Sequence, residues 1–291
     1  MAIYLRKDMR IAVIGITGKV GAIQTKHALD YGTNIVAGVS PGKRGQQVHG
    51  IPVFDSIGET VEEKGVNAAV VYVPAAKAPD AAHEAIDAGI ELLVIVTEHL
   101  PTKENILIKL HAREKGTIVI GPNCPGILTP GIGKLGIIPA NVATPGRIGV
   151  VSRSGSLSFE ITYGLSYLGL GQSTIVGIGG DSIPCTSFTD VLSSFEEDED
   201  TDAVVLIGEV GGSSEEKAAQ FIKKYMKKPV FAYIAGRSAP PGKKMGHAGA
   251  IVRGSYGTVK SKVEALEAAG VYIANSPKDI SRMILDVLGK Q

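Results

Sequence analysis

The chain has 291 residues, of which 30 are lysine or arginine and 29 are aspartate or glutamate, so its formal net charge is +1. This balance excludes a general electrostatic attraction to nucleic acid or to an anionic membrane, and the length predicts two domains. The two cysteines are too few for a disulfide framework or a zinc site, so we expect a cytoplasmic protein without a metal site of its own.

No segment approaches the length of a transmembrane helix. The N-terminal stretch MAIYLRKDMRIAVIGI has no long apolar core before its first strand and no Arg/Ser-rich leader. We therefore expect no targeting peptide.

The first half of the chain alternates apolar, β-branched segments with helical patterns. Such alternation is typical of a parallel sheet that is covered by helices on both faces. Strands are expected at 10–16, 34–39, 68–73, 92–96 and 117–120, and helical stretches at 21–32 and 78–89. The pattern predicts an α/β, Rossmann-like domain over residues 1–122.

A stretch rich in proline and glycine, GPNCPGILTPGIGKLGIIPANVATPG, interrupts the alternation. Its five prolines predict a linker over 123–146, with room for short strands. Strands resume at 147–151, 173–178, 203–208, 229–236 and 271–274, and an amphipathic helix follows at 279–289. A second doubly wound domain, with a flavodoxin-like parallel sheet, is therefore expected over 147–291.

A glycine-rich loop joins the first expected strand to the first helix. Gly15, Gly18 and Gly21 are spaced as G-x-x-G-x-x-G, which departs from the dinucleotide fingerprint G-x-G-x-x-G. Glycines at such a turn let backbone N–H groups and the start of the helix approach a pyrophosphate. The motif alone is weak and is also compatible with a turn that binds nothing.

The end of the second expected strand indicates which ligand the loop binds. A NAD site has Asp or Glu there, whereas this chain has Lys43 and Arg44 in VSPGKRG. Basic side chains favour a ligand with a further phosphate on its adenosine ribose, which coenzyme A (CoA) and NADP both carry. Because no residue pattern suggests hydride transfer, CoA is favoured over NADP.

Two further loops are expected to bind anions in the second half of the chain. Ser154, Gly155 and Ser156 lie where a strand gives way to a helix, and Gly211 to Ser214 open a later helix. Capping residues and free amides at helix N-termini attract anions. Both loops follow strands, so they are expected at the same edge of the sheet.

His247 lies in GKKMGHAGA, a loop of small residues and lysines without an apolar stripe. Glu209, at the end of its expected strand, is well placed to accept an imidazole N–H and to fix the tautomer that leaves the other nitrogen free. A neutral ring nitrogen near anion-binding amides predicts a phosphohistidine site. The alternative is a solvated loop histidine.

The motifs together resemble those of the α subunit of succinyl-CoA synthetase, also called succinate–CoA ligase. The resemblance runs nearly end to end, through GITGKVG, SPGKRG, VYVPA, GPNCPG, SRSG, GIGGD and GKKMGHAGAI. It implies phosphorylation of His247 and CoA binding by Thr17, Gly18, Lys19, Val20, Lys43, Val96, Thr97 and Glu98.

The resemblance also implies a partner and a reaction. The partner is a β subunit, in a heterodimer or a heterotetramer, whose ATP-grasp domain binds ATP or GTP with Mg²⁺. In the family's reaction, the nucleoside triphosphate phosphorylates the histidine and the phosphate passes to succinate. The CoA thiol then displaces the phosphate from succinyl phosphate.

One position departs from the family's pattern. Members commonly have SGTLTYE where this chain has SGSLSFE, so Phe159 takes the place of a tyrosine that the family assigns to the substrate site. The ring is kept and the hydroxyl is lost, which leaves malate or another small carboxylate as an alternative substrate. An alternative from another functional class is a non-catalytic regulatory protein that binds CoA or NADP.

Overall fold

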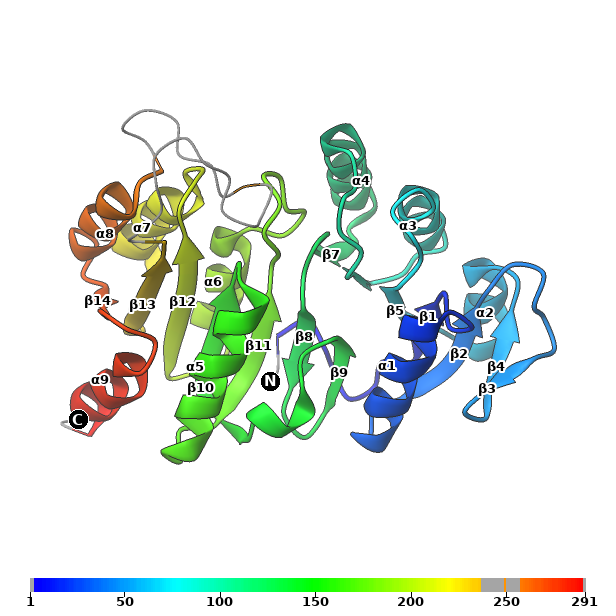
Figure 1. The fold of residues 1–291 in the computed structure, drawn as a ribbon, viewed down its shortest axis with the longest axis horizontal. Coiled ribbons are helices and arrows are strands. Elements are labelled where there is room, and N and C mark those ends of the chain that lie inside the picture. The colour runs from blue at the N-terminus through cyan, green and yellow to red at the C-terminus, as the bar shows by residue number, and fades with distance from the viewer. Residues whose placement is uncertain (1–2, 237–248, 250–256, 290–291) are drawn as a thin grey trace. The chain divides into compact units, whose positions relative to one another are not determined.

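The computed structural model describes residues 3–236, 249 and 257–289 (Figure 1). Contacts between Cα atoms divide the chain into two compact units. The N-terminal unit comprises Tyr4–Ala140 and Ile183–Thr186, and the C-terminal unit comprises Met1–Ile3, Asn141–Ser182 and Ser187–Gln291. The domain limits taken from the sequence, 1–122, 123–146 and 147–291, stay predictions.

The N-terminal unit holds a sheet whose order is β3-β4-β2-β1-β5-β6-β7. Its strands are β1 (Ile11–Ile14), β2 (Ile35–Val39), β3 (Gln47–Val48), β4 (Ile51–Phe54), β5 (Ala68–Val71), β6 (Leu92–Ile95) and β7 (Ile118–Ile120). Its helices are α1 (Lys19–Asp30), α2 (Ile57–Lys64), α3 (Ala78–Asp87) and α4 (Thr102–Lys115). All pairs are parallel except β3 with β4, so the parallel strands follow the Rossmann order 3-2-1-4-5-6.

The five strands expected in this half are confirmed, whereas β3 and β4 have no counterpart among them. The segment of β4 contains Pro52, and a proline within a short apolar run argues against a strand in sequence patterns. The structure accommodates Pro52 opposite Gln47, in the short antiparallel pair next to β2.

The segment between the two predicted domains contains a hairpin. Strands β8 (Gly126–Thr129) and β9 (Gly133–Gly136) pair antiparallel, and a 3-10 turn, η1 (Ala140–Val142), follows them. The glycines here are required by the packing, because a Cβ on Gly126 would lie 1.9 Å from the carbonyl oxygen of Leu135. The short strands that the sequence allows in this segment are therefore present.

The C-terminal unit contains parallel strands in the order β14-β13-β12-β10-β11. Its strands are β10 (Pro145–Ser152), β11 (Gln172–Gly177), β12 (Ala203–Glu209), β13 (Val230–Ala235) and β14 (Tyr272–Ile273). Its helices are α5 (Gly155–Tyr167), α6 (Phe188–Glu197), α7 (Ser214–Tyr225), α8 (Val259–Glu267) and α9 (Asp279–Leu288). Numbered along the chain, these strands follow the flavodoxin order 2-1-3-4-5, which confirms the expected fold class.

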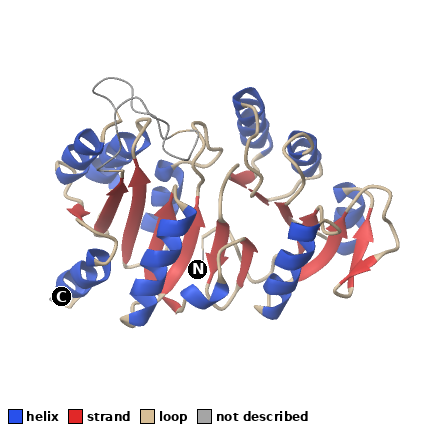
Figure 2. Ribbon diagram, viewed as in Figure 1, coloured by secondary structure: helices blue, strands red, loops and turns tan. Residues whose placement is uncertain are grey.

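Buried apolar strands form the core of the C-terminal unit. The side chains of β11 and β12 are buried throughout, as expected for parallel strands with helices on both faces. Helix α5 packs on β10 and β11 and lies in front of them in Figure 2, and α6 packs on β10. Gly149 of β10 makes room for the ring of Phe195, which a Cβ would approach to 2.7 Å.

The composition-based expectations concern membranes, metals and cysteines. None of the helices in the described ranges has the length and apolar character that crossing a bilayer requires. Within the same ranges, no group of three or more His, Cys, Asp or Glu side chains is arranged to hold a metal ion. Cys124 and Cys185 are both buried.

Candidate functional sites

The glycine-rich loop of the N-terminal unit places the start of α1 next to the end of β1. Gly15 has a φ of +86°, a conformation that favours glycine, and its carbonyl oxygen accepts a hydrogen bond from the Gly18 N–H at 3.0 Å. A Cβ on Gly21 would lie 2.2 Å from the same carbonyl oxygen. The loop therefore requires glycine at 15 for its turn and at 21 for close packing.

The first helix begins without a side-chain cap. Its N-cap residue is Gly18, which has no side chain that could accept a hydrogen bond from the first-turn amides. The neighbouring Thr17 instead donates its hydroxyl to Ser40 Oγ, at 3.0 Å, which ties the loop to the end of β2. Lys19 and Val20 are exposed on the first turn. The first-turn amides of this helix can donate hydrogen bonds to an anion, because no side-chain cap accepts from them.

The two basic residues after β2 differ in their surroundings. The Arg44 guanidinium forms ion pairs of 2.8 Å with both Glu59 and Glu63 of α2. Attraction to Glu59, and then the hydrogen bond to Glu63, raises the pKa of Arg44 above its ordinary value. The backbone N–H of Lys43 donates to Asp55 at 3.1 Å, and the side chain is exposed. Within the described ranges, no ion pair of the Lys43 ammonium is found, so Lys43 is the better candidate for binding a phosphate.

The loop after β6 lies next to the loop after β5. The Thr97 hydroxyl donates to the Val73 carbonyl at 2.8 Å, and Val73 in turn contacts Gly15, where a Cβ would lie 3.0 Å from its side chain. Val96 and Thr97 are half-buried, and Glu98 is exposed. The structure therefore brings the loops after β1, β2, β5 and β6 together at the carboxyl edge of one sheet, which is where ligands bind in open α/β sheets.

The second candidate site begins where β10 passes into α5. Ser154 is the N-cap residue of α5, and its Oγ accepts from the Leu157 N–H at 3.4 Å. Gly155 and Ser156 form the first turn, in which Ser156 is exposed. Phe159 lies one turn further along the helix and is half-buried. The expected helix start at Gly155 is confirmed.

Glu209 is the last residue of β12, which pairs with β10, so it lies at the same edge of the sheet as Ser154. Glu209 is 7% exposed, and its carboxylate forms an ion pair of 3.3 Å with Arg153. Gly211 and Gly212 follow with φ of +91° and +63°, and α7 begins at Ser214. The loop expected to open a helix at Gly211 to Ser214 is thus confirmed.

Two features of the second site bear on His247. The residue itself lies outside the described residues, so its predicted approach to Glu209 stays a prediction. Gly249 is described: its N–H donates to the Gly180 carbonyl at 3.0 Å, and a Cβ at this position would lie 2.8 Å from Arg153 Nη2. A position two residues beyond His247 in the sequence therefore contacts the guanidinium that binds Glu209.

Sequence reasoning missed a set of buried charges behind Glu209. Arg153 is 5% exposed, and Glu215 and Lys262 are both fully buried. Arg153 Nη1 donates to Glu215 at 3.0 Å, and Lys262 donates to the other oxygen of the same carboxylate. A charged residue directly after a buried strand, as in the SRSG segment, is the one signal in the sequence that indicates this cluster.

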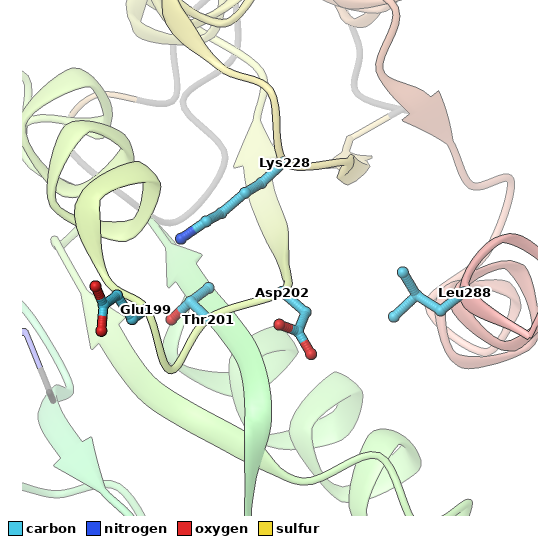
Figure 3. A pocket seen from close by; sticks show the side chains of 5 residues that line it. All are labelled: Glu199, Thr201, Asp202, Lys228 and Leu288. Atoms are coloured by element: carbon cyan, nitrogen blue, oxygen red, sulfur yellow. The ribbon is translucent and has the colours of Figure 1, made fainter. Parts of the chain in front are cut away.

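A pocket lies at the opposite edge of the C-terminal sheet (Figure 3). Glu199, Thr201 and Asp202 precede β12, Lys228 precedes β13, and Leu288 comes from the end of α9. The Lys228 ammonium donates to the Phe195 carbonyl at 2.7 Å.

Most polar groups of this pocket are engaged with the protein. The Thr201 hydroxyl donates to Asp198 at 2.7 Å. Arg147 binds both oxygens of Asp202, at 2.6 and 2.8 Å, and this hydrogen bonding lowers the pKa of the Asp202 carboxyl. These groups stabilise the loop, and the pocket lies away from the strand-end loops, so we do not assign a ligand to it.

Comparisons with known proteins cover both halves of the chain. The family model of the CoA binding domain matches residues 6–99, and that of the CoA-ligase domain matches residues 151–272. The succinate–CoA ligase (ADP-forming) subunit alpha of Methanothermobacter thermautotrophicus is 54% identical over 287 residues, which are 99% of this chain and 97% of that protein. Subunit alpha 2 of the same enzyme from Archaeoglobus fulgidus is 51% identical over 288 residues, which are 99% of this chain and 100% of that protein.

Solved structures share the fold. ATP citrate lyase from Methanothrix soehngenii, in complex with citrate and coenzyme A, superposes with a TM-score of 0.88 at 24% sequence identity. The match covers 98% of this chain and 51% of that one, so the chain spans about half the length of that structure.

Proposed function

The chain belongs to the family of succinate–CoA ligase α subunits, and we propose that it works with a β subunit to join succinate to CoA while ATP is converted to ADP and phosphate. The observation that carries the proposal is the identity of about half of all residues over nearly the entire length of both chains. The chain is the α subunit of an acid–CoA ligase, which does not fit a non-catalytic regulator that binds CoA or NADP.

We assign CoA to the carboxyl edge of the N-terminal sheet. The family match to a CoA binding domain over 6–99 supports this assignment, as do the uncapped start of α1 and the Lys43 ammonium. The residues proposed to bind CoA are Thr17, Gly18, Lys19, Val20, Lys43, Val96, Thr97 and Glu98. When bound, CoA supplies the thiol that receives the acyl group.

Lys43 is expected to bind the phosphate on the adenosine ribose of CoA. Replacing Lys43 by alanine should weaken CoA binding by about tenfold or more, because a charge-assisted contact contributes about 1.5–3 kcal/mol. Dephospho-CoA should bind both forms equally. Isothermal titration calorimetry measures the affinity of the wild type and of Lys43→Ala for each of the two ligands.

The matched control is the neighbouring Arg44→Ala. The Arg44 guanidinium is already paired with Glu59 and Glu63, so its removal should leave CoA affinity within about twofold. A loss of CoA affinity in Arg44→Ala but not in Lys43→Ala would contradict the assignment.

We propose that the phosphoryl group is transferred at the carboxyl edge of the C-terminal sheet. His247 receives it from the nucleotide, and Glu209 orients the imidazole by accepting its N–H. Ser154, Gly155 and Ser156, at the start of α5, bind the phosphoryl group. Gly155 and Ser156 do so through their amides and Ser154 through its hydroxyl hydrogen, because the Ser154 amide already donates to Ser152 Oγ at 3.0 Å. From His247 the phosphoryl group passes to the substrate carboxylate, and phosphate is released when the acyl group passes to the CoA thiol.

We propose that the β subunit carries the ATP-grasp domain that binds ATP and Mg²⁺. The naming of the relatives as alpha subunits of ADP-forming ligases supports a partner and this nucleotide, in either a heterodimer or a heterotetramer. We also propose a cytoplasmic location, which the low cysteine content of the chain, two residues in 291, supports.

Dependence on the β subunit tests the proposed function. The purified chain should show no succinyl-CoA synthesis and should still bind CoA, and activity should appear when the β subunit is added. A coupled assay of ADP release and thioester formation measures both. Substantial ligase turnover by the pure chain would contradict the proposal.

Phe159 is expected to influence substrate affinity. If a hydroxyl at this position contacts the substrate in relatives, Phe159→Tyr should restore a hydrogen bond that contributes about 0.5–1.5 kcal/mol, and up to about 3 kcal/mol if the acceptor is a charged carboxylate. The KM for succinate should then fall several-fold, with CoA affinity unchanged.

Steady-state kinetics with succinate and malate would measure this effect. An unchanged KM for both acids would assign Phe159 to packing alone. A gain confined to malate would move the substrate assignment away from succinate.

A further inference from the structure

A cluster of five charged side chains lies behind the second candidate site. It contains Arg153, which follows β10, and Glu209, which ends β12, together with Glu215 and Glu216 of α7 and Lys262 of α8. Two cations therefore face three carboxylates. Glu216 is the most exposed of the five, with 21% of its side chain accessible, so water can reach its carboxylate.

Arg153 is held rigidly by this cluster. Its Nη1 donates to the Gly211 carbonyl at 3.1 Å and to Glu215 Oε1 at 3.0 Å, and its backbone N–H donates to the Ile207 carbonyl at 3.1 Å. A guanidinium presents its donors in a fixed planar fork. Because Nη1 is fixed by these acceptors, the position of Nη2 is fixed as well, and Nη2 is the atom paired with Glu209 Oε1 at 3.3 Å.

Glu215 connects the two cations. Its Oε1 accepts from Arg153 and from the Glu209 backbone N–H, at 3.1 Å, and its Oε2 accepts from Lys262. Gly208 makes room for this carboxylate, since a Cβ there would lie 2.7 Å from Glu215 Cγ. Glu215 thus orients both the backbone of Glu209 and the guanidinium that binds its side chain.

Lys262 completes the cluster from α8. Its side chain is fully buried and donates to both Glu215 and Glu216. Without this ammonium, Glu215 would be a buried carboxylate whose one remaining cationic partner among the described residues is Arg153. Glu215 would then attract the Arg153 guanidinium more strongly, which would weaken the contact between Arg153 and Glu209.

From these contacts we propose that Arg153 is a positioning residue that orients the Glu209 carboxylate for the phosphohistidine step, with Glu215 and Lys262 fixing Arg153 in turn. The inference rests on the proposed function, because Glu209 acts there on His247. The contact of Gly249 with Arg153 supports it, since Gly249 is two residues from His247 in the sequence. Arg153 itself acts only through Glu209.

Arg153→Lys is the first test variant. It keeps the positive charge, but a single ammonium cannot reproduce the fork, and Glu215, at 3.0 Å, is a nearer acceptor than Glu209, at 3.3 Å. In the complex with the β subunit, the rate of His247 phosphorylation by ATP should fall at least tenfold, with CoA affinity unchanged. The matched control is Arg147→Lys, at the other end of the same strand, which should leave the rate within about twofold.

A double-mutant cycle separates positioning from a merely structural role. If Arg153 acts through Glu209, the variant that combines Arg153→Lys with Glu209→Gln should be phosphorylated no more than about twofold more slowly than the slower single variant. Independent, multiplicative effects would overturn the inference. So would a wild-type rate in Arg153→Lys.

Lys262→Met provides a second cycle, which decides the question if Arg153→Lys does not fold. Lys262 does not touch Glu209, yet its loss should slow phosphorylation about three- to tenfold and should again be non-additive with Glu209→Gln. A wild-type rate or multiplicative effects in this cycle would overturn the inference. Phosphorylation of the wild type at a residue other than His247 would instead contradict the proposed function itself, so the two failures can be told apart.

Discussion

Replacing His247 by asparagine is expected to abolish both the phosphoenzyme and ligase turnover. Asparagine has a similar size but has no ring nitrogen that can act as a nucleophile. In the complex with the β subunit, succinyl-CoA synthesis should fall by at least about 1,000-fold, as is usual when a covalent nucleophile is removed. Radiolabelled ATP and a steady-state assay measure the two losses on the same preparation.

The control for this variant is CoA binding. The residues proposed to bind CoA belong to the N-terminal unit, so CoA affinity in His247→Asn should equal that of the wild type. Glu209→Gln should fold normally and be phosphorylated more slowly, since the amide still accepts a hydrogen bond but stabilises developing imidazolium charge less well. A full phosphoenzyme signal in His247→Asn would refute the assignment of the nucleophile.

Gly21→Ala is expected to have the second large effect, on stability and on CoA binding together. The added Cβ would lie 2.2 Å from the Gly15 carbonyl oxygen and 2.9 Å from the Gly15 carbonyl carbon, both of which are backbone atoms. Overpacking of this kind costs about 1–3 kcal/mol of folding free energy. The loop must also shift, so CoA affinity should fall at least about tenfold.

Gly58→Ala is the matched control for this prediction. Gly58 also lies within a helix, α2, but a Cβ at this position would lie 3.9 Å from Ser56 Oγ, which is an ordinary van der Waals distance. Alanine is the better helix former, so this variant should be as stable as the wild type or more stable by about 0.5–1 kcal/mol. Thermal denaturation with and without CoA measures both variants. Wild-type CoA affinity in Gly21→Ala would show that the close approach of the loop is unnecessary.

The arrangement of strands could be predicted from the sequence where the pattern was local and strong. The runs of buried apolar residues in β1, β5, β10 and β12 predict parallel strands, and the glycine loop predicts where α1 begins. Strand β4 was not predicted, because a proline within its short segment, Pro52, argues against a strand.

The candidate sites show the limits of local patterns more sharply. Lys43 and Arg44 are equivalent in the sequence, and only the folded chain brings Glu59 and Glu63 to Arg44. In the same way, nothing near Arg153 in the sequence indicates its pairing with Glu215, which depends on β10 and β12 lying side by side. Residue types predicted the chemistry, whereas long-range pairing decides which side chains are available for it.

The most direct test of the central claim is a phosphoryl chase on the complex with the β subunit. The complex is labelled with ATP that carries a radioactive γ-phosphate, freed of nucleotide, and then mixed with succinate, CoA or both. The account predicts an acid-labile, base-stable label on His247 that is converted completely to inorganic phosphate, with an equal amount of succinyl-CoA, when both substrates are present. A label on another residue, or a His247 label that persists in the presence of both substrates, would contradict it.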